Sequence, residues 1–134
     1  MTEHHAALID TMILVAAADA DITDAEFEII GDIVGHLPVF RDYDRGRLRD
    51  TLDKVTDLLG AEDGLERGLA AIKESLPPRL RETAYALACD VAAADGVVTQ
   101  EEIRILDLLR QRLEIDRLIA SAIERGARAR FATA

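Results

Sequence analysis

The sequence has little of what disulfide frameworks and imidazole or thiolate metal sites require: one cysteine, three histidines and no tryptophan among 134 residues. The single cysteine, Cys89, excludes an intramolecular disulfide and favours a reducing compartment. No stretch approaches the roughly 18 consecutive apolar residues of a membrane-spanning helix, and no secretory signal pattern is present. We therefore expect a cytoplasmic protein that does not insert into a membrane.

Positive charge is also scarce, since 16 lysines and arginines face 26 aspartates and glutamates, which gives a net charge of −10. This charge repels phosphate backbones and anionic lipid headgroups, so we expect no nucleic-acid partner. It attracts metal cations and basic protein surfaces instead, although an acidic surface alone demonstrates no site.

Alternating strand-like patterns are absent as well, and apolar residues recur with a period near 3.6 along almost the whole chain. This pattern predicts an all-α fold in a single domain that covers residues 1–134. We expect about seven helices, at residues 3–19, 24–36, 43–59, 62–75, 79–94, 100–112 and 115–129.

Two of these segments, residues 3–19 and 79–94, are apolar on nearly all sides, so we expect them to form the buried centre. Each of the other helices shows a single apolar stripe that should pack against this centre. Members of these stripes are Phe27, Ile30, Val34 and Leu37 in and after the second helix, and Ile103, Leu106 and Leu113 in and after the sixth.

One motif occurs twice: VAAADADITDAE at residues 15–26 returns as VAAADGVVTQEE at residues 91–102. In each copy a threonine is followed three residues later by a glutamate, which is the Thr-x-x-Glu capping box that starts a helix. We predict these boxes at Thr23 with Glu26 and at Thr99 with Glu102.

A duplicated helical hairpin would relate two halves of the molecule by an approximate two-fold axis. In that arrangement the third and fourth helices bridge the halves and the seventh helix closes the end. The alternative is a recurrent local corner without spatial symmetry.

An aspartate closes the alanine-rich run of each copy, Asp19 in the first and Asp95 in the second. The negative end of a helix dipole disfavours a carboxylate there by up to about 1 kcal/mol. One explanation is local, with each side chain accepting backbone N–H bonds from the following turn. The other is a cation held by these two aspartates together with the capping glutamates, Glu26 and Glu102.

Carboxylate ligands would suit calcium, magnesium or manganese, whereas zinc would also require imidazole or thiolate. The spacing excludes a calcium-binding EF-hand, because position twelve of such a loop would be Ile30 or Leu106 rather than a glutamate.

No enzymatic motif is present, since the sequence lacks a phosphate-binding loop, a nucleophile elbow and a zinc-protease helix. The remaining candidates for such chemistry are isolated, and we interpret them as structural: His4, His5, His36 and Cys89. We therefore predict no catalytic residues and no organic cofactor.

The duplicated motif resembles the mark of the TerB family of tellurite resistance proteins, two copies of an alanine-rich helix that ends in Ala-Asp-Gly before a capped helix. The residues that carry the resemblance are Ala18-Asp19-Ala20 with Ile22, Thr23 and Glu26, Ala94-Asp95-Gly96 with Val98, Thr99 and Glu102, and the link Leu37-Pro38-Val39-Phe40. The first copy departs from the pattern, because Ala20 stands where the family has glycine and a left-handed residue would cost an alanine roughly 1 kcal/mol.

The resemblance implies a compact all-α fold, resistance to tellurite and related stresses, an acidic surface that binds divalent cations, and no catalytic activity. We therefore expect a non-catalytic stress-response protein that binds protein partners of a tellurite-resistance system, with a divalent-cation site at the paired corners. The alternative is a metal-independent helical scaffold in which the acidic residues serve only as helix caps.

Overall fold

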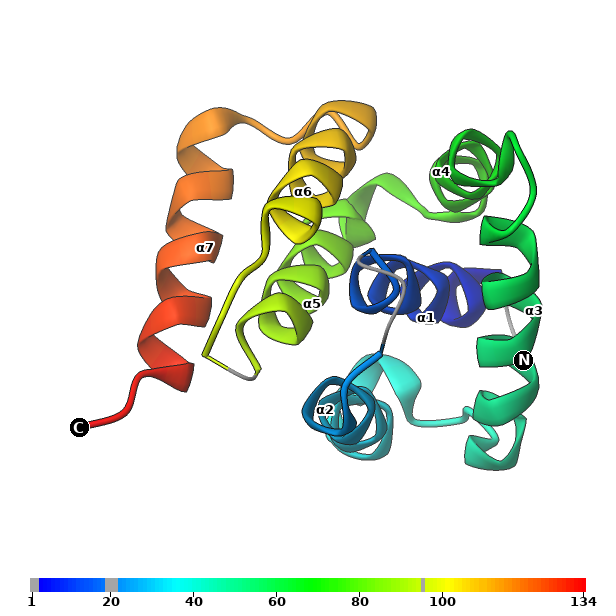
Figure 1. Cartoon of the computed structure of the whole chain (residues 1–134), viewed down its shortest axis with the longest axis horizontal. Helices are drawn as coiled ribbons and strands as arrows, with labels where there is room; N and C mark the ends of the chain where they lie inside the picture. Colours follow the sequence, from blue (N-terminus) through cyan, green and yellow to red (C-terminus); the bar gives the residue numbers. More distant parts are fainter. Residues whose placement is uncertain (1–2, 19–21, 95) are drawn as a thin grey trace.

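The computed structural model describes residues 3–18, 22–94 and 96–134, and these residues contain seven α-helices and no β-strand (Figure 1). The helices are α1 Glu3–Ala16, α2 Asp24–His36, α3 Leu48–Leu59, α4 Gly64–Ser75, α5 Arg81–Ala93, α6 Gln100–Arg112 and α7 Arg117–Phe131. Three short 3₁₀ segments complete them: η1 Pro38–Phe40, η2 Arg45–Arg47 and η3 Pro78–Leu80. The predicted all-α fold is confirmed.

The helix predicted from residue 43 begins later than expected, at Leu48. Asp44 accepts a hydrogen bond of 2.9 Å from the backbone N–H of Gly46 and so caps η2 instead. Tyr43, just before this cap, is 7% exposed and packs inward. The local side-chain cap therefore replaces the first turn of the expected α-helix with a 3₁₀ turn.

Helices α1 and α5 pack against each other at the centre of the molecule, as predicted (Figure 1). Their contact faces combine large side chains from α1 with small ones from α5, which lets the two helices approach closely. Fully buried examples are Leu8, Ile9, Met12 and Val15 of α1 and Ala84, Ala88 and Val91 of α5.

The predicted apolar stripes of α2 and α6 are wrong at one position each. Phe27 is 37% exposed, with the Arg49 guanidinium carbon 5.8 Å from its ring centre, and Ile103 is 48% exposed. The reason is that the capping glutamate points inward in each helix, so the buried stripe starts one residue before the predicted one. In α6 the stripe continues from Glu102 through Ile105 and Leu109.

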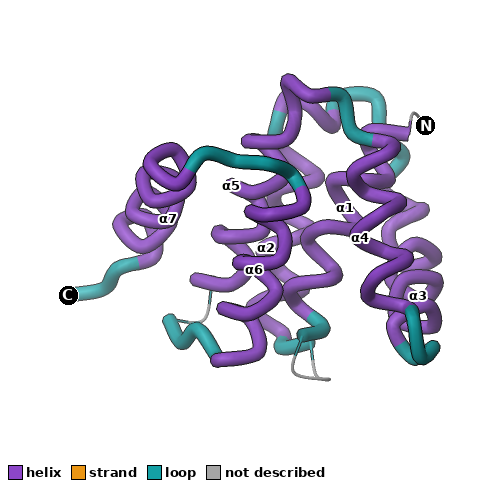
Figure 2. Tube along the Cα trace, turned by 90° about the horizontal axis from the view of Figure 1, so that it is seen from above, coloured by secondary structure: helices purple, strands orange, loops and turns teal. Residues whose placement is uncertain are grey.

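The two halves of the molecule, α1–α3 and α5–α7, pack in the same order. In each half the third helix packs on the first helix of that half. Helix α3 packs on α1, and α7 packs on α5, at opposite ends of the molecule (Figures 1 and 2). Helix α4 packs on α1 and α3 and also reaches α6. Of the two helices expected to bridge the halves, α4 does so, whereas α3 belongs to the first half.

Candidate functional site

Both predicted capping boxes are present with nearly identical geometry. The Thr23 N–H donates to Glu26 Oε1 at 2.9 Å, and the Glu26 N–H donates to Thr23 Oγ1 at 3.1 Å. The second box repeats these distances between Thr99 and Glu102. Each glutamate is only 2% exposed. The duplicated Thr-x-x-Glu pattern therefore fixes the starts of α2 and α6 by the same local hydrogen bonds.

The predicted cation site is only half described by the structure, because Asp19 and Asp95 lie outside the described residues. Glu26 and Glu102 are described, and one oxygen of each carboxylate already accepts a capping hydrogen bond. Across residues 3–18, 22–94 and 96–134, no group of three or more His, Cys, Asp or Glu side chains could hold a metal ion. The described donors do not form a ligand set by themselves, so the four-residue site stays a prediction.

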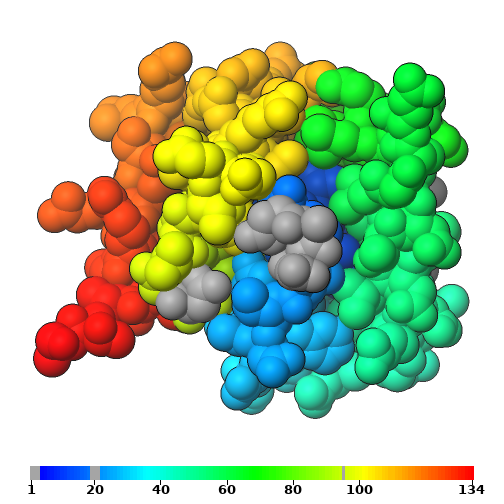
Figure 3. Space-filling view, in the orientation of Figure 1, coloured from blue at the N-terminus to red at the C-terminus, as the bar shows by residue number. Residues whose placement is uncertain are grey.

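The second corner contains the left-handed residue expected of the motif, because Gly96 has a φ of +81°. Glycine adopts this conformation without the steric cost that a Cβ would bring. Ala20, the residue in the corresponding position of the first corner, lies outside the described residues. Figure 3 shows residues of α2 (blue) and of α6 (yellow) on one face of the molecule.

Two of the isolated histidines, His5 and His36, each lie within hydrogen-bond distance of a backbone carbonyl oxygen. His5, at 5% exposure, is buried within α1, where its Nε2 lies 2.7 Å from the carbonyl oxygen of Val39. Its ring stacks on Phe40 at 5.7 Å and meets Tyr43 edge-on at 5.6 Å between ring centres. His36 Nδ1 lies 2.8 Å from the carbonyl oxygen of Asp32, one turn earlier in α2.

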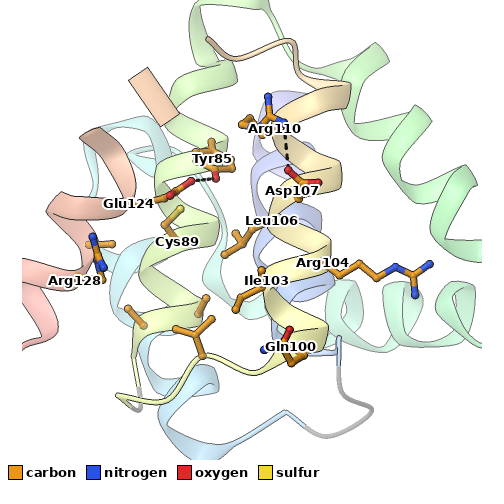
Figure 4. A pocket seen from close by; sticks show the side chains of 14 residues that line it. Tyr85, Cys89, Gln100, Ile103, Arg104, Leu106, Asp107, Arg110, Glu124 and Arg128 are labelled. Carbon is orange, nitrogen blue, oxygen red and sulfur yellow. Dashed lines mark hydrogen bonds and ion pairs between the residues drawn. The ribbon is translucent and has the colours of Figure 1, made fainter. Parts of the chain in front are cut away.

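Sequence reasoning missed an apolar groove on the side of α5, between α6 and α7 (Figure 4). The groove has a volume of about 640 Å³. Small side chains line it on α5, at Ala92 and Ala93, and on α7, at Ala127, while Val98, Ile103 and Leu106 form the α6 side. The groove side of α6 could have been found from the position of its buried stripe. Because Glu102 points inward, the next residue, Ile103, faces the groove.

Polar groups in the groove hold one another in place. The Tyr85 hydroxyl donates a 2.5 Å hydrogen bond to Glu124. Burial and, to a smaller extent, this bond raise the pKa of Tyr85. Asp107 accepts hydrogen bonds from Arg110 at 3.2 Å and from Gln111 at 2.9 Å.

The thiol in the groove is unsuited to nucleophilic chemistry. Burial, with a further contribution from the charge of Glu124, raises the pKa of Cys89 to about 12. Since the reactive form of cysteine is the thiolate, Cys89 remains a protonated thiol near neutral pH. The groove therefore offers an apolar binding surface rather than an activated nucleophile.

A family model described as tellurite resistance protein TerB matches residues 5–124 of the chain. The matched range includes both corners and most of the groove. No curated protein and no solved structure matches the chain. Among the described residues, no helix combines the length and the hydrophobicity needed to cross a membrane.

Proposed function

The chain belongs to the TerB family of tellurite resistance proteins, and from this we propose that it is a non-catalytic interaction module in the response to tellurite and related stress. The observation that supports an interaction role is the exposed apolar groove between α6 and α7. Exposed apolar surface of this kind is costly in water and often marks a binding site. A folded domain that keeps such a surface open is expected to cover it with a partner.

Two properties of the groove favour binding over catalysis. Its carboxylates, Glu124 and Asp107, each accept hydrogen bonds from neighbouring side chains. Its thiol, Cys89, is held protonated by burial. An acid or base catalyst would need a titratable group poised near the working pH and directed at a substrate.

A survival assay in the native cell tests this role. The chromosomal copy is deleted, or is replaced by one of two variants. Ile103→Lys places a charge in the groove. Leu118→Lys is the matched control, because the Leu118 side chain is 79% exposed and lies outside the groove. We expect the deletion and Ile103→Lys to lower survival in tellurite, and Leu118→Lys to behave as wild type. A deletion strain that tolerates tellurite and related oxidants as well as its parent would overturn the stress role.

We also propose that a divalent cation binds at the paired corners, through Asp19 and Asp95 with Glu26 and Glu102. The two matched capping boxes, which hold Glu26 and Glu102 at the starts of α2 and α6, support this proposal, together with the net charge of −10. The metal-independent scaffold is its rival, and the occupied Oε1 atoms of the two glutamates favour that rival.

Titration of chelator-treated protein with calcium, magnesium, manganese and zinc separates the two alternatives. The matched variant is Asp19→Asn/Asp95→Asn, which removes two charges and preserves side-chain size. Cation binding to the native state predicts a thermal shift that grows with metal concentration and is absent from the double variant. Identical shifts in both proteins would leave the scaffold as the better description.

A further inference from the structure

We propose that the groove between α6 and α7 binds an amphipathic helix of a partner protein, and that acidic residues flank the apolar face of this helix. This inference rests on the proposed interaction role and specifies the chemistry of the partner. It follows from the arrangement of three helices, from the side chains that line the groove, and from the local distribution of charge.

The arrangement leaves room for one more helix. Helices α6 and α7 both pack on α5 but scarcely contact each other, so α5 forms a floor between two walls (Figures 1 and 4). The walls contain 13 and 15 residues, respectively. At about 1.5 Å per residue each wall is roughly 20 Å long, which matches a partner helix of three to four turns. A helix laid on α5 here would complete a four-helix arrangement.

The first half of the molecule shows how an equivalent space is filled from within the chain. There the connection from α2 to α3, residues 37–47, runs between these two helices and buries Phe40 and Tyr43 (Figure 1). The connection from α6 to α7 is only residues 113–116. It contributes no aromatic side chain, so the second half keeps its groove open.

The groove lining suits large apolar side chains from a partner. Small side chains line its α5 floor, at Ala92 and Ala93, and its α7 wall, at Ala127. On the α6 side, Ile103 and Val98 are 48% and 40% exposed. Val97, next to Val98, is 65% exposed and extends the apolar surface beyond the groove. Leucine or isoleucine residues at every third or fourth position of a helix would fit this pattern.

The charge around the groove is opposite in sign to that of the rest of the chain. Residues 100–131, which contain α6 and α7, have seven basic and six acidic residues, a net charge of +1. The remaining residues contain nine basic and 20 acidic residues, a net charge of −11. The groove therefore lies in the part of the sequence that repels an acidic partner least.

Individual side chains strengthen this preference. Arg104, Arg110 and Arg128 border the groove, and Arg104 and Arg128 have no ion-pair or hydrogen-bond partner among the described residues (Figure 4). The carboxylates that border it, Glu124 and Asp107, already accept hydrogen bonds. The Arg128 guanidinium on the α7 wall can therefore pair with an acid on one flank of an incoming helix, whereas the Arg104 side chain extends away from the groove (Figure 4).

A second copy of this chain fits less well than a separate partner, because two molecules of net charge −10 repel each other. An anionic vesicle surface offers negative charge but no apolar helix to fill the groove. Self-association and vesicle binding are therefore outcomes that the experiment must distinguish from helix binding.

The experiment uses the full chain and a fluorescent synthetic helix of about four turns, with leucines at helical spacing and glutamates on both flanks. A matched peptide has lysines in place of the glutamates. We expect the glutamate peptide to bind at least about tenfold more tightly, and its affinity to fall as salt is raised. Backbone amide shifts should concentrate in α5, α6 and α7.

Three variants locate and check the interaction. Ile103→Lys should abolish binding of the glutamate peptide, whereas Leu118→Lys should retain it. Arg128→Glu should weaken the glutamate peptide and strengthen the lysine peptide, a reversal that loss of folding could not produce. Far-UV circular dichroism of each variant confirms its helical content.

Equal binding of the two peptides, no binding of the glutamate peptide, or amide shifts outside the groove would overturn the proposal. So would a concentration-dependent dimer that Ile103→Lys dissociates, or binding to phosphatidylglycerol vesicles that excludes the peptide. Tellurite survival is a separate measurement. If Ile103→Lys lowers survival but the glutamate peptide does not bind, the interaction role stands and only the chemistry of the partner is wrong.

Discussion

Tyr85 of α5 and Glu124 of α7 form a 2.5 Å hydrogen bond that attaches the terminal helix to the centre of the molecule. The Tyr85 side chain is 1% exposed, so its hydroxyl has no water to replace this partner. A second attachment, from Arg130 to Asp90, joins the same two helices. The position of α7, and with it one wall of the groove, depends on these polar contacts as well as on apolar packing.

Removal of the Tyr85 hydroxyl should therefore destabilise the fold. We expect Tyr85→Phe to lower the free energy of unfolding by about 1 kcal/mol, because the bond between α5 and α7 is lost while water can still reach the exposed Glu124 carboxylate. Glu124→Gln keeps an acceptor oxygen and should cost less than half as much. Urea denaturation followed by circular dichroism measures both. A Tyr85→Phe protein as stable as wild type would show that the bond contributes nothing to stability.

The two capping boxes should contribute equally, because their geometries match. Thr23→Ala and Thr99→Ala should each lower the free energy of unfolding by about 1 kcal/mol, and the double variant by about the sum. Thr56→Ala is the control, since Thr56 lies within a helix, is exposed and bonds only to the Leu52 carbonyl oxygen. A control variant that loses as much stability as the cap variants would argue against a specific capping contribution.

The caps show why most of the fold could be predicted from the sequence. A capping box is a local pattern, so Thr23 and Thr99 marked the starts of α2 and α6 to the residue. Helices α1 and α5, which are apolar on nearly all sides, could only be central. The phase of the amphipathic helices was harder, because an inward-pointing charged residue contradicts the usual rule that glutamate faces water. The burial of Glu26 and Glu102 in the structure shows which face of each helix points inward.

The groove lay beyond sequence reasoning for a different reason. Its existence depends on the distance between α6 and α7, which share little contact, and no local pattern encodes that distance. Ile103 could be assigned to an apolar stripe, but whether that stripe met another helix or open space is a tertiary property. The predicted aspartates, Asp19 and Asp95, lie outside the described residues and keep the status of a prediction.

Two glycines should respond in opposite directions to alanine. A Cβ added to Gly31, inside α2, would meet nothing within 4 Å, so Gly31→Ala should stabilise the protein by about 0.5–1 kcal/mol. A Cβ on Gly64, at the start of α4, would lie 1.9 Å from the backbone oxygen of Leu58. Gly64→Ala should therefore destabilise the turn between α3 and α4 severely. Thermal unfolding measures the change in stability of each variant. A stabilised Gly64→Ala protein would contradict the close approach of α3 and α4.

Asp10 of α1 should make stability depend on pH in a direction unusual for a carboxylate. Burial raises its pKa to about 6, against an ordinary value of 3.8, although the nearby Lys54 charge opposes this shift. The folded state then holds the proton more tightly than the unfolded state. The stabilising contribution is complete below the ordinary value and is lost as pH rises through about 6.

Asp10→Asn removes this dependence, because the amide stays neutral at every pH. Since Asp10 is partly exposed, solvent screening limits the effect, and we expect the variant to exceed wild type by about 1–2 kcal/mol near pH 8. The advantage should shrink as pH falls below about 6 and disappear near about pH 3, below the ordinary value of 3.8, where both the folded and the unfolded wild type hold the proton. Asp57→Asn, at an exposed position on α3, controls for the loss of one negative charge. Urea midpoints at the two pH values measure the difference, and equal effects of the two substitutions would mean that the net charge, not the burial of Asp10, is responsible.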